Sequence, residues 1–164
     1  MSGSVEVVTS ELHVAAGRLR ASAQRLQDGL SSVDLETSNL LSSGWKGEAA
    51  TADFAARLEK AAGELQASAM WFMANGMKDP NNVGAGAVPF MHLVGVVAVG
   101  LMWLRMASAA SRLKAAGEGD AAFLDAKLMT ARFFAERVLP EAGALRRQIE
   151  GGADAIMALP VEMF

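Results

Sequence analysis

Few side chains in this sequence could do chemistry. The chain has no cysteine, and its two histidines, His13 and His92, lie far apart in the sequence. A thiolate nucleophile, a disulfide and a thiolate metal site are therefore excluded, and two distant histidines form no recognisable metal site. Because His92 lies within a long apolar run, we expect it to be a hydrogen-bonded histidine of the core rather than a buried base or a ligand.

Two pairs of carboxylates could serve as a general acid and a general base: Glu136 with Glu141, and Asp120 with Asp125. An arginine lies four residues before Glu136 and another four residues before Glu141. That is the spacing of exposed ion pairs on a helix, and it accounts for both glutamates without catalysis. We predict no catalytic, cofactor-binding or metal-binding residue in this chain, and no enzyme activity of its own.

The elements that position these residues centre on the run from Val83 to Leu104, which carries no Asp, Glu, Lys or Arg. As a helix it would be roughly 33 Å long, close to the thickness of a bilayer's hydrocarbon core. It is either a membrane span or a helix that protein buries on nearly all sides. Since proline suits a first helical turn, we expect this helix to begin around Pro89, which leaves it short for a span. We therefore favour a buried central helix over insertion in a membrane.

Composition favours an all-α protein. Of the 164 residues, 52% are hydrophobic, Ala and Leu are abundant, and only four are proline. A net charge of −3, with no basic cluster larger than Arg146-Arg147, gives no reason to expect a nucleic-acid partner. The N-terminus lacks the cationic and apolar regions of a Sec signal peptide, so we expect a cytoplasmic protein.

A strict seven-residue repeat marks the first helix, of about thirty residues. A turn at residues 42–47 follows, in which two glycines flank Trp45 and permit a sharp reversal. An apolar pattern then resumes and predicts a second helix that ends near Ala74. Two helices with so short a connection run antiparallel, so the sequence predicts a helical hairpin. The repeat consists of Leu12, Leu19, Leu26, Val33 and Leu40, and the second pattern consists of Phe54, Leu58, Ala61, Leu65 and Phe72.

With Trp45-Lys46-Gly47 at its turn, this hairpin resembles the WxG family over about residues 1–60. These are small helical-hairpin substrates of type VII secretion, also called ESAT-like proteins. The resemblance implies pairing with another hairpin, and export without a Sec signal peptide. Such substrates usually carry a Tyr-x-x-x-Asp/Glu export signal after the second helix, whereas this chain has no tyrosine.

Turn signals divide the second half into helices. The third helix should stop at Gly117, and Asp120 is a good N-cap for the fourth. Pro140 must kink or restart that helix, and Asp154 should cap a short terminal turn. We therefore predict a hairpin that continues into a bundle, with four main helices and the last broken at Pro140.

A series of motifs runs in order through residues 58–164. They include Asp79-Pro80-Asn81-Asn82, Gly100-Leu101-Met102-Trp103, Thr130-Ala131-Arg132-Phe133-Phe134 and Arg137-Val138-Leu139-Pro140-Glu141. Together they resemble the C-terminal helical domain of a subgroup of acyl-CoA dehydrogenases, which handle short, medium or methylthio-substituted acyl-CoA thioesters. In such enzymes upstream domains hold the flavin and the catalytic carboxylate. The resemblance thus implies packing, dimer support or the shaping of an acyl-CoA site, with FAD only if a partner supplies those domains.

The chain as a whole resembles the beginning of one protein joined to the end of another. We predict a WxG-like hairpin at residues 1–60 and a dehydrogenase-like helical domain at residues 61–164. Its expected function is a non-catalytic interaction or dimerisation module that forms a homodimer or heterodimer through its helices. The alternatives are a type VII secretion substrate and a subunit or remnant of a flavin-dependent acyl-CoA oxidoreductase. The predicted turn residues are Trp45 and Gly47, and the predicted packing core is Leu19, Leu26, Val33, Leu40, Phe54, Trp71, Trp103, Phe133 and Phe134.

Overall fold

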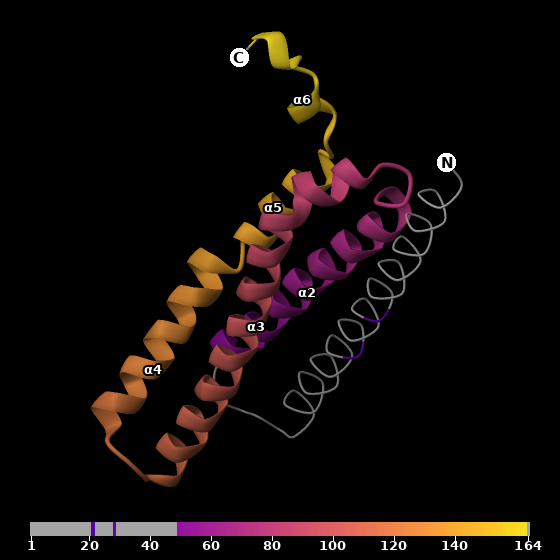
Figure 1. The fold of residues 1–164 in the computed structure, drawn as a ribbon. Helices are drawn as coiled ribbons and strands as arrows, with labels where there is room; N and C mark the ends of the chain where they lie inside the picture. Colours follow the sequence, from indigo (N-terminus) through magenta and orange to yellow (C-terminus); the bar gives the residue numbers. More distant parts are fainter. Residues whose placement is uncertain (1–20, 22–27, 29–48, 164) are drawn as a thin grey trace.

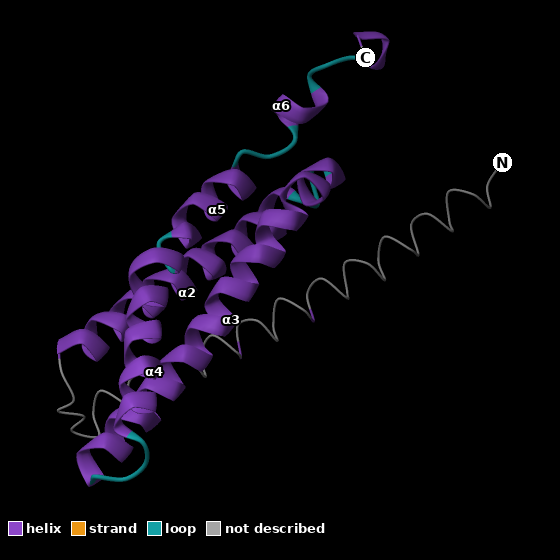
Figure 2. Ribbon diagram, turned by 90° about the vertical axis from the view of Figure 1, so that its left-hand side faces the viewer, coloured by secondary structure: helices purple, strands orange, loops and turns teal. Residues whose placement is uncertain are grey.

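The computed structural model describes Ala21, Asp28 and residues 49–163. Within these residues every regular element is a helix, so the predicted all-α fold is confirmed (Figures 1 and 2). The elements are α2 (Ala49–Asn75), α3 (Pro80–Ala116), α4 (Ala121–Phe133), the π-helix η1 (Phe134–Val138), α5 (Glu141–Glu150), α6 (Asp154–Met157) and the 3-10 helix η2 (Val161–Met163).

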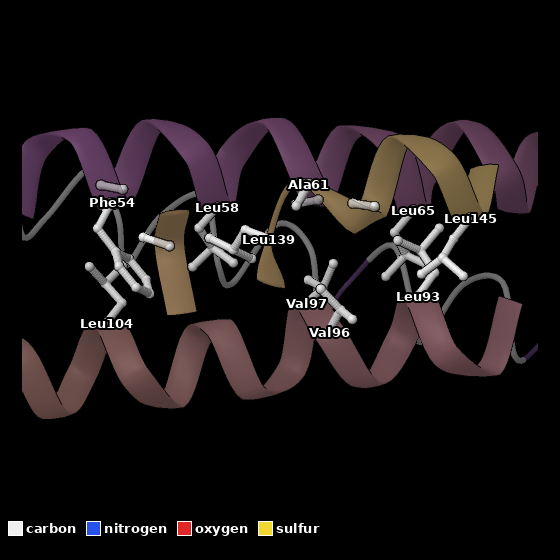
Figure 3. Packing of buried hydrophobic residues seen from close by; sticks show 14 of the residues in the cluster. Phe54, Leu58, Ala61, Leu65, Leu93, Val96, Val97, Leu104, Leu139 and Leu145 are labelled. Atoms are coloured by element: carbon white, nitrogen blue, oxygen red, sulfur yellow. The ribbon is translucent and has the colours of Figure 1, made fainter. Parts of the chain in front are cut away.

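The core lies between α2 and α3, and η1 and α5 close it (Figure 3). Leu58 of α2, Leu93 and Leu104 of α3, and Ile149 of α5 are at most 1% exposed. Of the described helices, α3 contacts α2, α4, η1 and α5, so it is the central helix against which the others pack.

The second apolar pattern marks the buried face of α2. Phe54, Leu58, Ala61 and Leu65 are all buried, and they pack against α3 and α5 (Figure 3). The first helix of the predicted hairpin lies outside the described residues.

The start of α3 also differs from the prediction. The helix begins at Pro80, not around Pro89, because the Oδ1 atom of Asp79 accepts a hydrogen bond of 3.0 Å from the backbone N–H of Asn81. This N-cap, with proline directly after it, is a strong start signal. Pro89 therefore lies inside α3, where its missing N–H costs one helical hydrogen bond.

The burial of α3 is one-sided, which corrects the expectation of a helix enclosed on nearly all sides. In its most apolar stretch 28% of the residues are buried, and by length and composition α3 could cross a membrane. His92 is exposed and is not a core histidine. On the buried side Gly100 permits close packing, since a Cβ atom there would lie 2.9 Å from Cδ1 of Leu58.

Asn82, on the first turn of α3, ties together two distant parts of the chain. Its Oδ1 atom accepts a hydrogen bond of 2.9 Å from the backbone N–H of Ala153, which is 2% exposed. The preceding Gly152 has a φ of 63°, and a Cβ atom there would lie 2.9 Å from the same oxygen. Any residue other than glycine at position 152 is thus disfavoured for two reasons: the positive φ is strained for it, and its Cβ atom would clash with Asn82.

The break at Pro140 is a change of helix type followed by a restart. The Leu139 N–H donates to the carbonyl oxygen of Phe134, five residues earlier, which gives the π-helical turn η1. Because proline has no N–H, α5 begins afresh at Glu141. Near the C-terminus, Asp154 is the first residue of α6 and not its cap, which is Ala153.

The residues predicted for the core fall into three groups. Phe54 is buried, while Trp71, Trp103 and Phe134 are partly buried against the core. Phe133 is 60% exposed, so its assignment to the core was wrong. The remaining predicted core residues, Leu19, Leu26, Val33 and Leu40, lie outside the described residues, as do the predicted turn residues Trp45 and Gly47. The boundary proposed between residues 60 and 61 lies inside α2.

We expect Asn82→Ala to lower the free energy of unfolding by about 1–3 kcal/mol, because it leaves the buried Ala153 N–H without its acceptor. The matched control is Asn81→Ala, in the same helical turn, since the side chain of Asn81 is exposed. The control should change stability by less than about 0.5 kcal/mol. Urea unfolding of the two variants measures both values, and equal losses would contradict the assigned role of Asn82.

Candidate functional site

The outward side of α3 carries a long, largely apolar surface. Its members alternate at spacings of four and three residues, which places them on one side of the helix over roughly 38 Å. Val88 is 72% exposed and Met106, the least exposed of the large members, is 37% exposed. We call this surface the α3 stripe; it consists of Val88, His92, Gly95, Val99, Met102, Met106, Ala109 and Leu113.

Aromatic side chains adjoin the α3 stripe where α4 packs against α3. The Lys127 ammonium lies 5.7 Å from the ring centroid of Trp103 and 5.1 Å from that of Phe123. These are cation–π distances, and they hold Lys127 between the two helices. Phe123 and Phe133 are 57% and 60% exposed, so α4 adds apolar area to the outer surface.

A pocket of about 350 Å³ lies on another part of the molecule, between α2 and the start of α5. Three cationic side chains line it: Arg57, Lys60 and Arg147. Arg57 also pairs with Asp53 at 2.7 Å. With Glu64 as the one acidic residue of its lining, the pocket carries an excess of basic side chains.

At the edge of this pocket, Glu64 joins α2 to α5. Its Oε2 atom accepts a hydrogen bond of 3.0 Å from Nη1 of Arg146, and Nε of the same arginine donates to Glu150 at 2.8 Å. These bonds, to Glu150 first and then to Glu64, raise the pKa of Arg146 above its ordinary value. The charges serve the packing of two helices, because each has a partner within the fold.

Three of the four carboxylates weighed as acid–base candidates have structural partners. Asp120 is the N-cap of α4 and accepts from the Ala122 N–H at 2.9 Å. Asp125 pairs with Lys114, which joins α4 to the last turn of α3. Glu136 pairs with Arg132 at 2.7 Å, at the predicted four-residue spacing.

Nothing in the described residues assembles a catalytic or metal site around the candidates. Of the ion pairs in that part of the chain, none joins Arg137 to Glu141, so that predicted pair is not formed. Among the described residues, no group of three or more His, Cys, Asp or Glu side chains is placed to hold a metal ion. The surface that stands out is the α3 stripe.

Sequence reasoning missed the α3 stripe and Asn82. The alternation of four and three residues is present in the sequence between residues 88 and 113, but nearly every side of that helix is apolar, which hides it. Asn82 was noted as part of a dehydrogenase-like motif but not as a tie between distant segments, because its bond to Ala153 spans 71 residues and leaves no local pattern.

The sequence matches the family described as "Acetyl-CoA dehydrogenase C-terminal like" over residues 4–160. The chain belongs to this family. The match extends through both of the segments that we predicted to be separate, and it supports the dehydrogenase-like resemblance of the second half. The WxG resemblance is not shown, and it stays a prediction about residues outside the described part of the chain.

A curated relative of this C-terminal-like domain is 3-methylmercaptopropionyl-CoA dehydrogenase of Ruegeria pomeroyi. The two are 38% identical over 112 residues, which is 68% of this chain. The aligned region is 19% of the relative's length, so this chain corresponds to about a fifth of that enzyme.

We expect the Glu64–Arg146 pair to matter more for stability than the exposed Arg132–Glu136 pair. Glu64→Gln should lower the free energy of unfolding by about 1 kcal/mol, because the side chain of Glu64 is 19% exposed and joins two helices. Glu136→Gln, within one helical segment, should cost less than about 0.5 kcal/mol. Thermal unfolding at one pH compares the two, and a larger loss for Glu136→Gln would contradict this ranking.

Proposed function

We propose that this chain is a non-catalytic helical domain of an acyl-CoA dehydrogenase and that it dimerises through the α3 stripe. The observation that carries the proposal is the exposure of this stripe along one side of the central helix. Contiguous apolar surface that water would otherwise cover is typical of protein–protein interfaces. Asp120 caps a helix, and Asp125 and Glu136 form ion pairs, which fits a domain that packs rather than reacts.

A second copy of the chain is the partner that fits the α3 stripe best. When two α3 helices run antiparallel about a two-fold axis between Val99 and Met102, the alternating spacing brings stripe positions opposite one another. Gly95 then faces Met106 of the second copy, and Ala109 faces His92. Each small residue of one copy thus lies opposite a large residue of the other, so the stripe is complementary to itself.

Flavin and the reacting acyl group would be held outside this domain. In the related dehydrogenase about four fifths of the protein lie outside the region aligned with this chain. FAD and a catalytic carboxylate would come from such a region or from a partner. This domain would support the dimer and the walls of the acyl-CoA site.

A second candidate is a subunit of a flavin-dependent acyl-CoA oxidoreductase. The printed name of the relative, a dehydrogenase of 3-methylmercaptopropionyl-CoA, favours it. This candidate predicts that the chain co-purifies with a flavoprotein. Purified chain that shows no flavin absorbance, either alone or mixed with a dehydrogenase, would contradict it.

Sedimentation velocity tests dimerisation. We expect the wild-type chain to form a dimer, and Met102→Glu to raise its dissociation constant at least about tenfold, since the dimer would bury an unpaired charge. The control is Met129→Glu on α4, where the side chain is 67% exposed and lies outside the stripe. A monomeric wild type at about 100 µM, or equal effects of both variants, would contradict the proposal.

The antiparallel register has its own test. Gly95→Met should weaken the dimer, because it places two large side chains opposite each other. Adding Met106→Ala should restore affinity, since the large and small partners then exchange places across the two-fold axis. Loss of affinity in the double variant equal to the sum of the single losses would contradict this register.

A further inference from the structure

The pocket between α2 and the start of α5 has a basic rim over an apolar floor. Arg57, Lys60 and Arg147 are exposed at its edge. Its volume of about 350 Å³ lies at the lower end of the range of roughly 300–1,000 Å³ that small-molecule sites occupy. The floor is made of small or branched apolar side chains that are each at most 3% exposed: Ala61, Ala135, Leu139 and Ala142.

Helical spacing brings the charged side chains to this pocket. On α2, Arg57 and Lys60 are three residues apart and Glu64 follows four residues later, which places them along one side of the helix. On α5, Gly143 and Arg147 are four residues apart and also share a side. A Cβ atom built on Gly143 would lie 3.6 Å from Nη1 of Arg147 and 3.9 Å from Oε1 of Glu64. The side of α5 that carries Gly143 therefore faces α2 across the pocket.

Two of the three cations have no ion-pair partner within the described part of the chain. Of the ion pairs there, none includes Lys60 or Arg147. Arg57 donates from Nε to Asp53 at 2.7 Å, which leaves its two terminal nitrogens for another acceptor. Glu64, the acidic residue of the lining, is already paired with Arg146. The rim thus carries positive charge that a bound anion would offset.

We propose that this pocket binds a phosphate dianion, either free phosphate or the terminal group of a phosphomonoester. Two guanidinium groups offer forked donors that suit phosphate oxygens, and the lysine adds a compact positive charge. A phosphomonoester carries about two negative charges near neutral pH and has three acceptor oxygens, so it can accept from all three side chains at once. A carboxylate has one charge and two oxygens, and it would leave one cation unpaired. The apolar floor offers a packing surface to the organic part of the ligand.

This site is separate from the proposed dimer surface. Its lining comes from α2, η1, α5 and residues 139–140, which join η1 to α5, and no residue of α3 takes part. The proposed phosphate site therefore does not depend on the α3 stripe, and a failure of either proposal would leave the other standing.

Isothermal titration calorimetry of the full chain tests the class of ligand with three probes: inorganic phosphate, adenosine monophosphate and cyclic adenosine monophosphate. We expect adenosine monophosphate to bind with a dissociation constant of about 1 mM or below. The cyclic compound has the same base and sugar but is a singly charged diester, so it should bind at least about tenfold more weakly. Tighter binding of adenosine monophosphate than of inorganic phosphate would support an organic phosphomonoester as the ligand, and equal binding of these two would support free phosphate.

Variants of the rim separate a built site from general surface charge. Lys60→Gln and Arg147→Gln should each raise the dissociation constant at least about fivefold, since each removes a charge-assisted hydrogen bond. The matched control is Lys78→Gln, which removes the same charge from an exposed residue between α2 and α3 and should change the constant less than about twofold. Gly143→Leu keeps all three cations but adds a side chain to the lining, so it should weaken binding at least about fivefold.

Four results would overturn the proposal. The first is the absence of binding heat for every probe up to about 10 mM. The second is equal affinity for adenosine monophosphate and its cyclic diester. The third is an equal loss in Lys60→Gln and Lys78→Gln, which would show general surface charge, and the fourth is unchanged affinity in Gly143→Leu. Thermal unfolding checks the fold of each variant, and Lys60→Gln, which alters an exposed side chain, keeps the test decisive if Gly143→Leu unfolds.

Discussion

The packing of one side of α3 against α2 and α5 is the constraint on which the rest of this fold depends. Leu93 and Leu104 are almost fully buried there, and Gly100 allows Leu58 of α2 to approach the helix backbone. Both α2 and α5 pack against this side of α3, and they also contact each other directly. Hydrophobic burial on that side stabilises the domain, and the remaining apolar surface of α3 must be covered by other means.

One-sided burial explains why α3 has an outer surface with coiled-coil spacing. The outer residues of α3 are mostly large, and the two small positions, Gly95 and Ala109, would match large ones in the proposed symmetric pair.

The sequence was sufficient for the helical class, for the stop at Gly117 and for the N-cap at Asp120, because each depends on local chemistry. It misplaced the start of α3, since two prolines compete for the first turn and only the cap at Asp79 decides between them. It also misjudged Phe133 and His92, whose apolar neighbours in sequence lie on other sides of their helices.

The candidate site depended on information that periodicity does not carry. An apolar run of this length predicts burial, but it does not say which side is buried or by what. The contact of Asn82 with Ala153 and the bond between Glu64 and Arg146 join residues that are far apart in sequence, and no local pattern predicts them. The family match extends through the boundary at residue 60, which the two family resemblances had suggested.

Methionine oxidation by hydrogen peroxide, followed residue by residue with mass spectrometry, tests the central claim that α3 turns one side to the core and the other to a second copy. Met102 and Met106 lie on the α3 stripe, whereas Met129 on α4 lies outside it. As protein concentration rises from about 1 µM to about 100 µM, we expect oxidation of Met102 and Met106 to slow at least about fivefold relative to Met129. A constant ratio of these rates across that range would contradict the account.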